Sequence, residues 1–232
     1  MRHAVIVTAA GSSRRFNTQS SSDLKKEFLT VDGESVLCRS IRPFLQTEGL
    51  CALVVTYRKD DFQTTKDLVS TLDTAGVKVI LAEGGDTRQQ SVFNGLKALY
   101  ELRDELDISV VSIHDGARPY LDSALVKACI EEAERTGGAC PCLPVTDTIV
   151  RIGGDGLMEK ALDRETLRTV QTPQAFRFPD IYLAHLDAEG QAQFTDDTQI
   201  FIRWGGKVAC VPGSAENRKI TFAGDIVQRR DK

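Results

Sequence analysis

The stretch AVIVTAAGSSRRF, residues 4–16, decides the fold, because a short apolar run is followed at once by a glycine, two serines and two adjacent arginines. An apolar run of this length and composition is typical of a buried strand. Arginines are poor core residues, so after Gly11 the chain must form a loop that is either solvated or holds an anion. Taken alone, this stretch leaves both interpretations open.

Short β-rich runs alternate with helical patterns along most of the chain. The early runs are nearly continuous in Val and Ile, as in strands that are covered on both faces. This alternation implies right-handed crossovers and predicts an α/β fold with a mainly parallel sheet covered by helices. We expect strands at residues 4–7, 52–56, 77–81, 108–113, 139–143 and 208–211. We expect helices at about residues 35–46, 60–72, 88–101, 123–135, 179–188 and 196–204.

Length and composition limit the class of protein. The 232 residues suffice for one sizeable core, so we predict a single domain over residues 1–232. A net charge of −4 argues against broad nucleic-acid binding, which needs a basic surface. No run approaches the roughly 20 apolar residues of a membrane span, and the run at residues 4–10 ends too abruptly for a signal peptide. We therefore expect a cytoplasmic protein that binds neither nucleic acid nor membrane.

Six scattered cysteines include only one close pair, Cys140 and Cys142. In an extended strand both side chains point to the same face. The spacing is not one of the usual zinc patterns, and no histidine lies near it in the sequence. We expect reduced thiols here rather than a metal or redox centre.

One segment interrupts the alternation of strands and helices. Two short β-like runs, residues 147–152 and 157–162, flank Gly153-Gly154-Asp155-Gly156, which predicts a β-hairpin. An isolated hairpin is marginally stable in water, and this one has apolar residues but no obvious sheet to join. We expect an arm over about residues 146–166 that packs against a second subunit.

In an open parallel sheet, ligands bind beyond the carboxyl ends of the strands. Three polar or glycine-containing segments follow predicted strands at these ends, namely residues 9–28, 83–91 and 114–119. The first contains Gly11 and four basic residues, Arg14, Arg15, Lys25 and Lys26. Backbone N–H groups beside such a turn form an anion-binding nest. The loop matches neither a Walker A nor a G-x-G-x-x-G motif, which argues against a P-loop ATPase and a dehydrogenase.

The other two segments each permit two interpretations. Asp86, after Gly84-Gly85, either caps the following helix or accepts a hydrogen bond from an exocyclic amino group of a base. Asp115 either forms a turn salt bridge with Arg118 or binds a ribose hydroxyl or Mg²⁺. We expect His114 to be a structural residue at the strand end. No Ser-His-Asp or Cys-His arrangement is readable, which argues against covalent catalysis.

Taken in order, these pieces resemble the 2-C-methyl-D-erythritol 4-phosphate cytidylyltransferase family of the non-mevalonate isoprenoid pathway. The resemblance runs from about residue 4 to 221, and it rests on the order and spacing of several motifs together. The motifs are Ala9-Ala10-Gly11 with Arg15, Lys26, Gly84-Gly85-Asp86, His114-Asp-Gly-Ala-Arg-Pro119, Asp147-Thr148, Asp163-Arg164, Thr172-Pro-Gln174, Thr195-Asp196, and Asn217 with Lys219.

The resemblance implies a Rossmann-like nucleotidyltransferase sheet and a transfer of CMP from CTP to 2-C-methyl-D-erythritol 4-phosphate. The products would be 4-diphosphocytidyl-2-C-methyl-D-erythritol and pyrophosphate. It also implies Mg²⁺ as cofactor, near Asp115, and a homodimer in which each hairpin arm reaches into the partner subunit. No covalent enzyme intermediate is expected, because in phosphoryl-type transfer the protein mainly positions groups and stabilises charge.

The same resemblance assigns roles to individual residues. Three cations would act on the CTP phosphates as catalytic residues: Arg15, Lys26 and Lys219. The CTP-binding residues would be Ala9, Ala10, Gly11, Gly85, Asp86, Ser91, Asp115 and Ala117. The residues around methylerythritol phosphate would be Arg118, Thr148, Arg164, Thr172 and Thr195.

The chain departs from the family pattern in its first loop. Ser13 and Phe16 stand where the family has a glycine and a methionine, and the polar run before Lys25 is longer than usual. Lys25 itself replaces a proline. We therefore assign the phosphate-binding lysine to Lys26 from the Glu27-Phe28-Leu29 that follows it, with Lys25 as the alternative.

Three other classes share parts of this pattern. A CDP-ribitol pyrophosphorylase has the same fold and most of the CTP residues, and Arg164 and Thr195 favour methylerythritol phosphate only modestly. A non-catalytic nucleotide-binding regulator would not need Arg15, Lys26 and Lys219 on both sides of the α-phosphate. A glycosyltransferase is disfavoured because the sequence has no Asp-x-Asp motif. Since the sequence ends soon after Lys219, we expect no fused cyclodiphosphate synthase domain.

Overall fold

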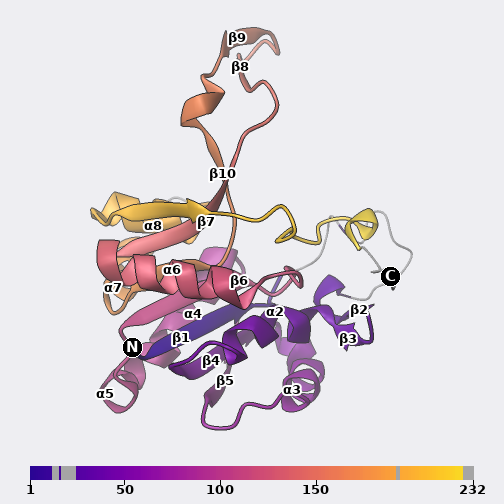
Figure 1. Ribbon diagram of the computed structural model, residues 1–232, viewed down its shortest axis with the longest axis vertical. Coiled ribbons are helices and arrows are strands. Elements are labelled where there is room, and N and C mark those ends of the chain that lie inside the picture. Colours follow the sequence, from indigo (N-terminus) through magenta and orange to yellow (C-terminus); the bar gives the residue numbers. More distant parts are fainter. Residues whose placement is uncertain (12–15, 17–24, 192–193, 227–232) are drawn as a thin grey trace.

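The computed structural model describes residues 1–11, 16, 25–191 and 194–226. Its central feature is an eight-stranded sheet with helices on both faces, from which a narrow arm projects (Figure 1). In spatial order the strands are β10 (Arg168–Val170), β7 (Gly138–Pro144), β11 (Gln174–Arg177), β6 (Val110–Asp115), β1 (His3–Thr8), β4 (Leu50–Tyr57) and β5 (Lys78–Glu83), and β12 (Val208–Pro212) pairs with β7.

Most strands of this sheet point the same way. β1 pairs in parallel with β4 and β6, β4 with β5, and β7 with β12. β11 runs antiparallel to both β6 and β7, and β10 runs antiparallel to β7. The predicted mainly parallel sheet is therefore confirmed, as are all six predicted strands. β10 and β11 were not predicted.

The core lies on both faces of the sheet because successive residues of each strand point in opposite directions. Val5 and Val7 of β1 face one apolar cluster, and Ala4 and Ile6 face the other, all with no exposed surface. The helices on the first face are α2 (Val36–Leu45), α3 (Phe62–Ser70) and α6 (Ser123–Thr136). Those on the second are α4 (Arg88–Glu101), α7 (Asp180–Asp187) and α8 (Asp197–Trp204). These six helices confirm the predicted ones, with ends that differ by a few residues.

Shorter elements connect the main ones. They are η1 (Lys26–Phe28), β2 (Thr30–Val31), β3 (Glu34–Ser35), η2 (Lys59–Asp61), α5 (Arg103–Leu106), η3 (Arg164–Thr166) and η4 (Ala223–Asp225). η1 follows β1 in the described chain and brings its first residue, Lys26, to the carboxyl end of the sheet. No helix in the described part of the chain is both long enough and apolar enough to cross a membrane.

The predicted hairpin is confirmed as a separate two-stranded sheet of β8 (Val150–Ile152) and β9 (Met158–Ala161). In Figure 1 it forms the end of the arm and projects well away from the central sheet. Its tip carries large apolar side chains in exposed positions, with Ile152 52%, Leu157 67% and Met158 76% exposed. Within one chain these side chains have almost no core to pack against.

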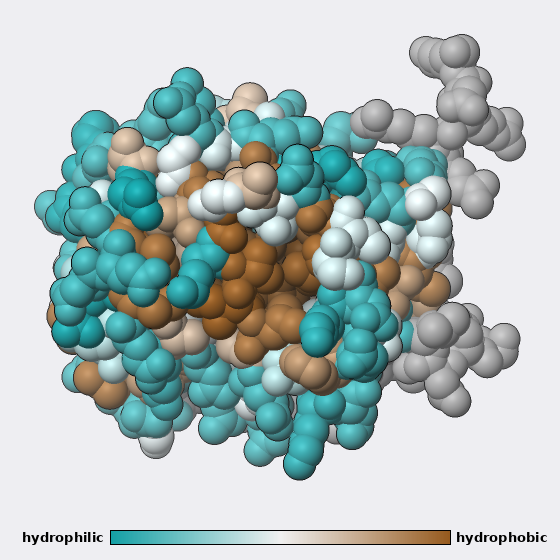
Figure 2. All heavy atoms as spheres, turned by 90° about the horizontal axis from the view of Figure 1, so that it is seen from below, coloured by the Kyte–Doolittle hydropathy of each residue, from teal (hydrophilic) through white to brown (hydrophobic). Residues whose placement is uncertain are grey.

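One exposed face and one buried pair of cysteines complete the description of the fold. Seen from below the view of Figure 1, hydrophobic side chains gather at the centre of one face (Figure 2). On another part of the sheet, the Sγ atoms of Cys140 and Cys142 in β7 lie 3.8 Å apart, as predicted for alternate residues of one strand. All six cysteines are free thiols.

Candidate active site

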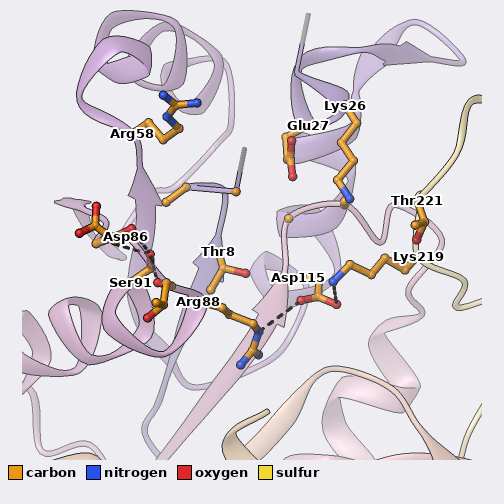
Figure 3. Close-up of a pocket in the computed structure, with 16 residues that line it drawn as sticks. Thr8, Lys26, Glu27, Arg58, Asp86, Arg88, Ser91, Asp115, Lys219 and Thr221 are labelled. Carbon is orange, nitrogen blue, oxygen red and sulfur yellow. Dashed lines mark hydrogen bonds and ion pairs between the residues drawn. The ribbon is translucent and has the colours of Figure 1, made fainter. Parts of the chain in front are cut away.

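A cavity of about 900 Å³ lies at the carboxyl ends of the central parallel strands. Each strand contributes the residues with which it ends or those of the loop that follows it, as expected for an open α/β sheet. Figure 3 shows the charged side chains converging on this cavity from separate elements. The described residues that line it are Thr8, Ala10, Gly11, Lys26, Glu27, Arg58, Gly85, Asp86, Thr87, Arg88, Ser91, Asp115, Gly116, Ala117, Lys219 and Thr221.

Asp115, the last residue of β6, is a buried acid of this cavity, as is Glu27. Its Oδ2 lies 3.0 Å from Nζ of Lys219 and 3.1 Å from Nε of Arg118, and its Oδ1 lies 3.8 Å from Nε of Arg88. Burial alone would raise the pKa of Asp115, but the three cations hold it far below the usual range of a carboxyl. Asp115 is therefore an anion at neutral pH.

One sequence interpretation of Asp115 is confirmed, and the other, binding of a ribose hydroxyl or Mg²⁺, stays a prediction. The turn salt bridge with Arg118 is present, and the carboxylate also lines the cavity. Oδ2 is engaged by two donors, whereas the contact of Oδ1 with Nε of Arg88, at 3.8 Å, is longer than a hydrogen bond. One available carboxylate oxygen fits Mg²⁺ when a ligand's phosphates and water supply the rest of its shell. Among the described residues, no group of three or more His, Cys, Asp or Glu side chains could hold a metal without such help.

The two adjacent lysines of the first loop have different environments. Lys26 lines the cavity, and its Nζ donates to the backbone carbonyl of Ile220 at 2.8 Å. Lys25 is buried, and its Nζ lies 3.0 Å from the carbonyl oxygen of Ala9 and 2.5 Å from Oδ2 of Asp61. The geometry therefore places Lys26, and not Lys25, where it can meet an anionic ligand.

The start of α4 corrects one interpretation of Asp86. The N-cap of α4 is Thr87, whose Oγ1 accepts from the backbone N–H of Gln90 at 3.1 Å. Asp86 lies one residue before the N-cap and does not cap this helix. It lines the rim of the cavity, and its side chain is exposed (Figure 3). Gly84, two residues before Asp86, is required by close approach, because a Cβ at this position would lie 2.3 Å from Cβ of Ala10. This close packing brings the loop after β5 against the loop after β1.

The floor of the cavity is held by a small polar cluster. Thr172 Oγ1 accepts from the backbone N–H of Asp115 at 3.2 Å and pairs with Nδ1 of His114 at 2.9 Å. Burial lowers the pKa of His114 to about 3, so its ring is neutral near pH 7. His114 is thus the structural residue that the sequence predicted.

The structure brings together most of the residues predicted to bind CTP. Ala10, Gly11, Gly85, Asp86, Ser91, Asp115 and Ala117 line the cavity with Lys26 and Lys219. Ala9 is buried beneath it and accepts the hydrogen bond from Lys25. Arg15 lies outside the described residues.

The five residues predicted to bind the acceptor are not among the described residues that line the cavity. Arg118 is turned toward Asp115, and its Nη1 donates to the carbonyl of Asn217 at 2.9 Å. Thr195 is exposed just before α8. Thr148 and Arg164 belong to the projecting arm, where Nη1 of Arg164 donates to the carbonyl of Thr146 at 2.9 Å. Thr172 lies in the buried cluster described above.

Two arginines of the cavity were not predicted. Arg58 directly follows β4, so the rule that ligands bind beyond strand ends would have found it. Arg88 is the first residue of α4, two positions after Asp86. A charged side chain at a helix start is common on protein surfaces, and its sequence context alone did not distinguish it.

A mainly parallel sheet with a cation-lined cavity at its carboxyl edge defines an α/β protein whose cavity suits an anionic ligand. The family model described as IspD, 2-C-methyl-D-erythritol 4-phosphate cytidylyltransferase, matches residues 3–230. The chain belongs to this family.

Individual relatives agree with this assignment. A bifunctional enzyme IspD/IspF of Rhodopseudomonas palustris (strain BisA53) is 40% identical over 234 residues, which cover 100% of this chain and 56% of that protein. The 2-C-methyl-D-erythritol 4-phosphate cytidylyltransferase of Clostridium acetobutylicum is 35% identical, covering 97% of this chain and 94% of that protein. This chain therefore spans about half the length of the bifunctional relatives, at 56% and 55% for two of them.

Solved structures give the same result for the fold. The 4-diphosphocytidyl-2C-methyl-D-erythritol synthase of Anaerococcus prevotii matches with a TM-score of 0.82 and 28% identity, over 97% of this chain and 92% of that one. The 2-C-methyl-D-erythritol 4-phosphate cytidylyltransferase of Thermus thermophilus matches with a TM-score of 0.72 and 30% identity, over 97% and 96% of the two chains.

Proposed function

We propose that this protein transfers CMP from CTP to 2-C-methyl-D-erythritol 4-phosphate and releases pyrophosphate, as a step of isoprenoid biosynthesis. The observation that carries the proposal is the meeting of Lys26, Lys219 and Asp115 around one cavity, in a chain of this family. Two cations on separate elements suit a polyphosphate, whose charge is spread over several oxygens.

The reaction needs no covalent enzyme intermediate. An oxygen of the acceptor's phosphate attacks the α-phosphorus of CTP in line, and the bond from that phosphorus to the bridging oxygen of the β-phosphate breaks. The electron pair of that bond leaves with pyrophosphate, and a phosphate dianion attacks without first losing a proton. The residues of this chain contribute by positioning the two anions and stabilising the charge that develops on the equatorial oxygens.

Each cation has a part in this scheme. Lys219, paired with Asp115 at 3.0 Å, would stabilise charge at the α-phosphate. Lys26 and Arg15 would brace the phosphates from the first loop. Oδ1 of Asp115 would hold Mg²⁺, which when bound would neutralise charge on the phosphates of CTP.

The rim of the cavity offers groups suited to a base and ribose. The Asp86 carboxylate can accept from the amino group of cytosine, and the buried Ser91 hydroxyl can donate or accept beside it. The Gly85 N–H already donates to Oγ of Ser91 at 3.1 Å, which fixes that hydroxyl in place. Asp115 and Ala117, at the other side of the cavity, would face the ribose.

The proposed form is a homodimer. The apolar tip of the arm is exposed in a single chain, which is unfavourable unless another surface covers it. If the arm of one subunit reaches the cavity of the other, Thr148 and Arg164 would contact the acceptor there, and a guanidinium suits its phosphate. CTP as substrate and cysteines that are all free thiols favour a cytoplasmic location.

The direct test is to supply the purified protein with CTP, Mg²⁺ and one acceptor at a time, and to follow pyrophosphate release. We expect turnover with 2-C-methyl-D-erythritol 4-phosphate and much slower turnover with ribitol 5-phosphate. Faster turnover with ribitol phosphate would move the function to a CDP-ribitol pyrophosphorylase. Binding of CTP without release in either mixture would contradict the proposed catalysis.

A further inference from the structure

Asp197, the first residue of α8, has a carboxylate with no exposed surface. Its Oδ1 lies 3.2 Å from Nε2 of His185, and its Oδ2 lies 2.7 Å from Nη2 of Arg88. Its backbone N–H donates to Oε1 of Gln174 at 3.1 Å. Burial alone would raise the pKa of Asp197, but Arg88 and His185 hold it below its usual range. A buried anion is strongly destabilising without a partner, so Asp197 requires the guanidinium where it lies.

Arg88 also belongs to the cavity. Its side chain is 28% exposed and lines the cavity, and its Nε lies 3.8 Å from Oδ1 of Asp115 (Figure 3). The guanidinium therefore lies between a fully buried carboxylate of α8 and the buried carboxylate at the end of β6. A planar guanidinium can face two carboxylates in fixed directions, whereas a lysine ammonium acts as a single flexible point charge.

We propose that Arg88 is a positioning residue for the cytidylyl transfer: Asp197 holds its guanidinium in place, and the guanidinium orients Asp115 toward Lys219. The two oxygens of Asp115 face opposite partners, Oδ1 toward Arg88 and Oδ2 toward Lys219. If Arg88 moves, Oδ1 of Asp115 loses its charged partner, and only the contacts of Oδ2 with Arg118 and Lys219 hold the carboxylate. The position of the Lys219 ammonium in the cavity is then less well fixed. The inference rests on the proposed function, since it acts through Lys219.

Two variants test the two ends of this arrangement. Arg88→Lys keeps a positive charge for Asp197 but removes the planar fork, and Asp197→Asn keeps the shape but removes the charge that holds Arg88. Each is expected to lower kcat about 10- to 100-fold, as when a group that orients a site residue is removed. The KM for CTP should change less than about threefold, because the ground-state contacts to CTP remain. The double variant should be no slower than the slower single one, because both break the same arrangement.

A purely structural ion pair predicts a different pattern, namely a lower Tm with normal kcat per folded molecule. Tm is therefore measured for every variant. Arg135→Lys is the matched control, because Arg135 pairs with Glu132 on the surface of α6, away from the cavity. A kcat for Arg88→Lys within about twofold of this control would overturn the proposal, and so would losses that multiply in the double variant. If Asp197→Asn does not fold, Arg88→Lys decides by the same criterion.

The hold of Asp197 on the Arg88 guanidinium can also be measured by proton exchange, which needs no enzymatic turnover. This measurement separates the inference about Arg88 from the proposed function. In protein labelled with ¹⁵N-arginine, the Nη–Hη resonance of Arg88, whose Nη2 faces Asp197, is identified by its loss in Arg88→Lys. We expect slow exchange of this proton with water in the wild type and faster exchange in Asp197→Asn. Fast exchange in the wild type would overturn the inference even in an active enzyme. Slow exchange of this proton in a protein that releases no pyrophosphate would overturn the proposed function, and with it the role of Arg88 in the transfer. The Arg88–Asp197 ion pair itself would stand.

Discussion

Lys25 and Lys26 are adjacent in the sequence but differ in surroundings. Lys25 is buried against the carbonyl of Ala9 and the carboxylate of Asp61, whereas Lys26 extends into the cavity. In the tight 3₁₀ geometry of η1 and its first flanking residue, successive side chains leave the backbone in different directions. One lysine thus fixes the loop to the end of β1, and the other lines the cavity and contacts the carbonyl of Ile220.

This difference gives a matched pair of substitutions. Lys26→Ala should lower kcat about 10²- to 10³-fold, because it removes a preorganised charge from the reaction. It should lower the free energy of unfolding less than Lys25→Ala does, because Lys26 is less buried than Lys25. Lys25→Ala should instead lower the free energy of unfolding by about 1–3 kcal/mol, because it leaves a carbonyl and a carboxylate without their donor. Pyrophosphate-release kinetics and urea unfolding of both variants measure these effects. The reverse pattern would make Lys25 the phosphate-binding lysine.

The sequence predicted those site residues that obey one rule, namely that ligands bind beyond the carboxyl ends of parallel strands. Asp115, Gly85 and Asp86 were found because they follow strands whose carboxyl ends meet at one edge. Lys219 lies 104 positions after Asp115, and no local pattern connects them, so only the family resemblance singled it out. Arg88 was missed because its partner Asp197 is also distant, and such a pair depends on how α4 and α8, which both pack against α7, are placed in the folded chain.

At the scale of elements, the start of α4 separates a structural side chain from one that faces the cavity. Thr87 satisfies the backbone N–H of Gln90, and the carboxylate of Asp86 is left at the cavity. Substitutions at Thr87 and Asp86 therefore test helix capping and base recognition separately.

Thr87→Ala should lower the free energy of unfolding by about 1 kcal/mol through loss of the cap, with the preference for CTP over UTP unchanged. Asp86→Ala should change the free energy of unfolding by less than about 0.5 kcal/mol but weaken that preference. In the wild type UTP should be a poor substrate, because a site built to bond an amino group penalises its absence. Chemical unfolding and kcat/KM for both nucleotides provide the test. Equal kcat/KM for CTP and UTP in the wild type would exclude Asp86 from base recognition.

The long helices and strands were predictable because the periodicity of their apolar residues and the capping or turn residues at their ends indicate the same bounds. α6, for example, begins after Asp122, whose side chain accepts from the N–H of Ala124, and ends at Gly137 with φ of +105°. β11 was missed because Pro173 and Pro179 flank it closely, and such spacing is typical of loops. Its strand geometry comes from its place between β6 and β7, which both supply hydrogen-bonding partners. The three-residue β10 has only β7 as its neighbour, so tertiary contacts define it too.

At the scale of the whole molecule, two buried histidines couple stability to pH. Burial lowers the pKa of His3 to about 4 and that of His114 to about 3, against 6.5 in an unfolded chain. Between pH 6.5 and these values the unfolded chain binds protons that the folded rings do not, so acidification favours unfolding. Asp115 and Asp197, whose pKa values are also lowered, add to this only below their unfolded value of 3.8.

The free energy of unfolding should therefore fall as pH is lowered from 6.5 to 4.5, by up to about 1.4 kcal/mol per pH unit for each histidine. His114→Asn removes one of the two titrating rings and should reduce this slope by about half. Urea unfolding at several pH values in this window measures it. A slope that is unchanged in His114→Asn would show that His114 is protonated in the folded protein.

The projecting arm makes the assembly itself testable. Its apolar tip is exposed in one chain, and its residues Thr148 and Arg164 are absent from the cavity of their own subunit. Closed two-fold pairing would let each arm complete the site of the other subunit. Truncating the arm would not distinguish this from simple destabilisation, so two point variants in separate subunits are the better probe.

Lys26→Ala damages the cavity, and Arg164→Ala damages the arm, so each variant alone should be nearly inactive. In a mixed dimer, one site combines an intact cavity with an intact arm, and the other carries both defects. Random mixing makes about half of the dimers mixed, so about a quarter of all sites should recover. Pyrophosphate release is measured after mixing, with subunit exchange confirmed by two different affinity tags and wild type mixed with itself as control. If both residues act within one subunit, every site keeps a defect, and the absence of any recovery would rule out the shared site.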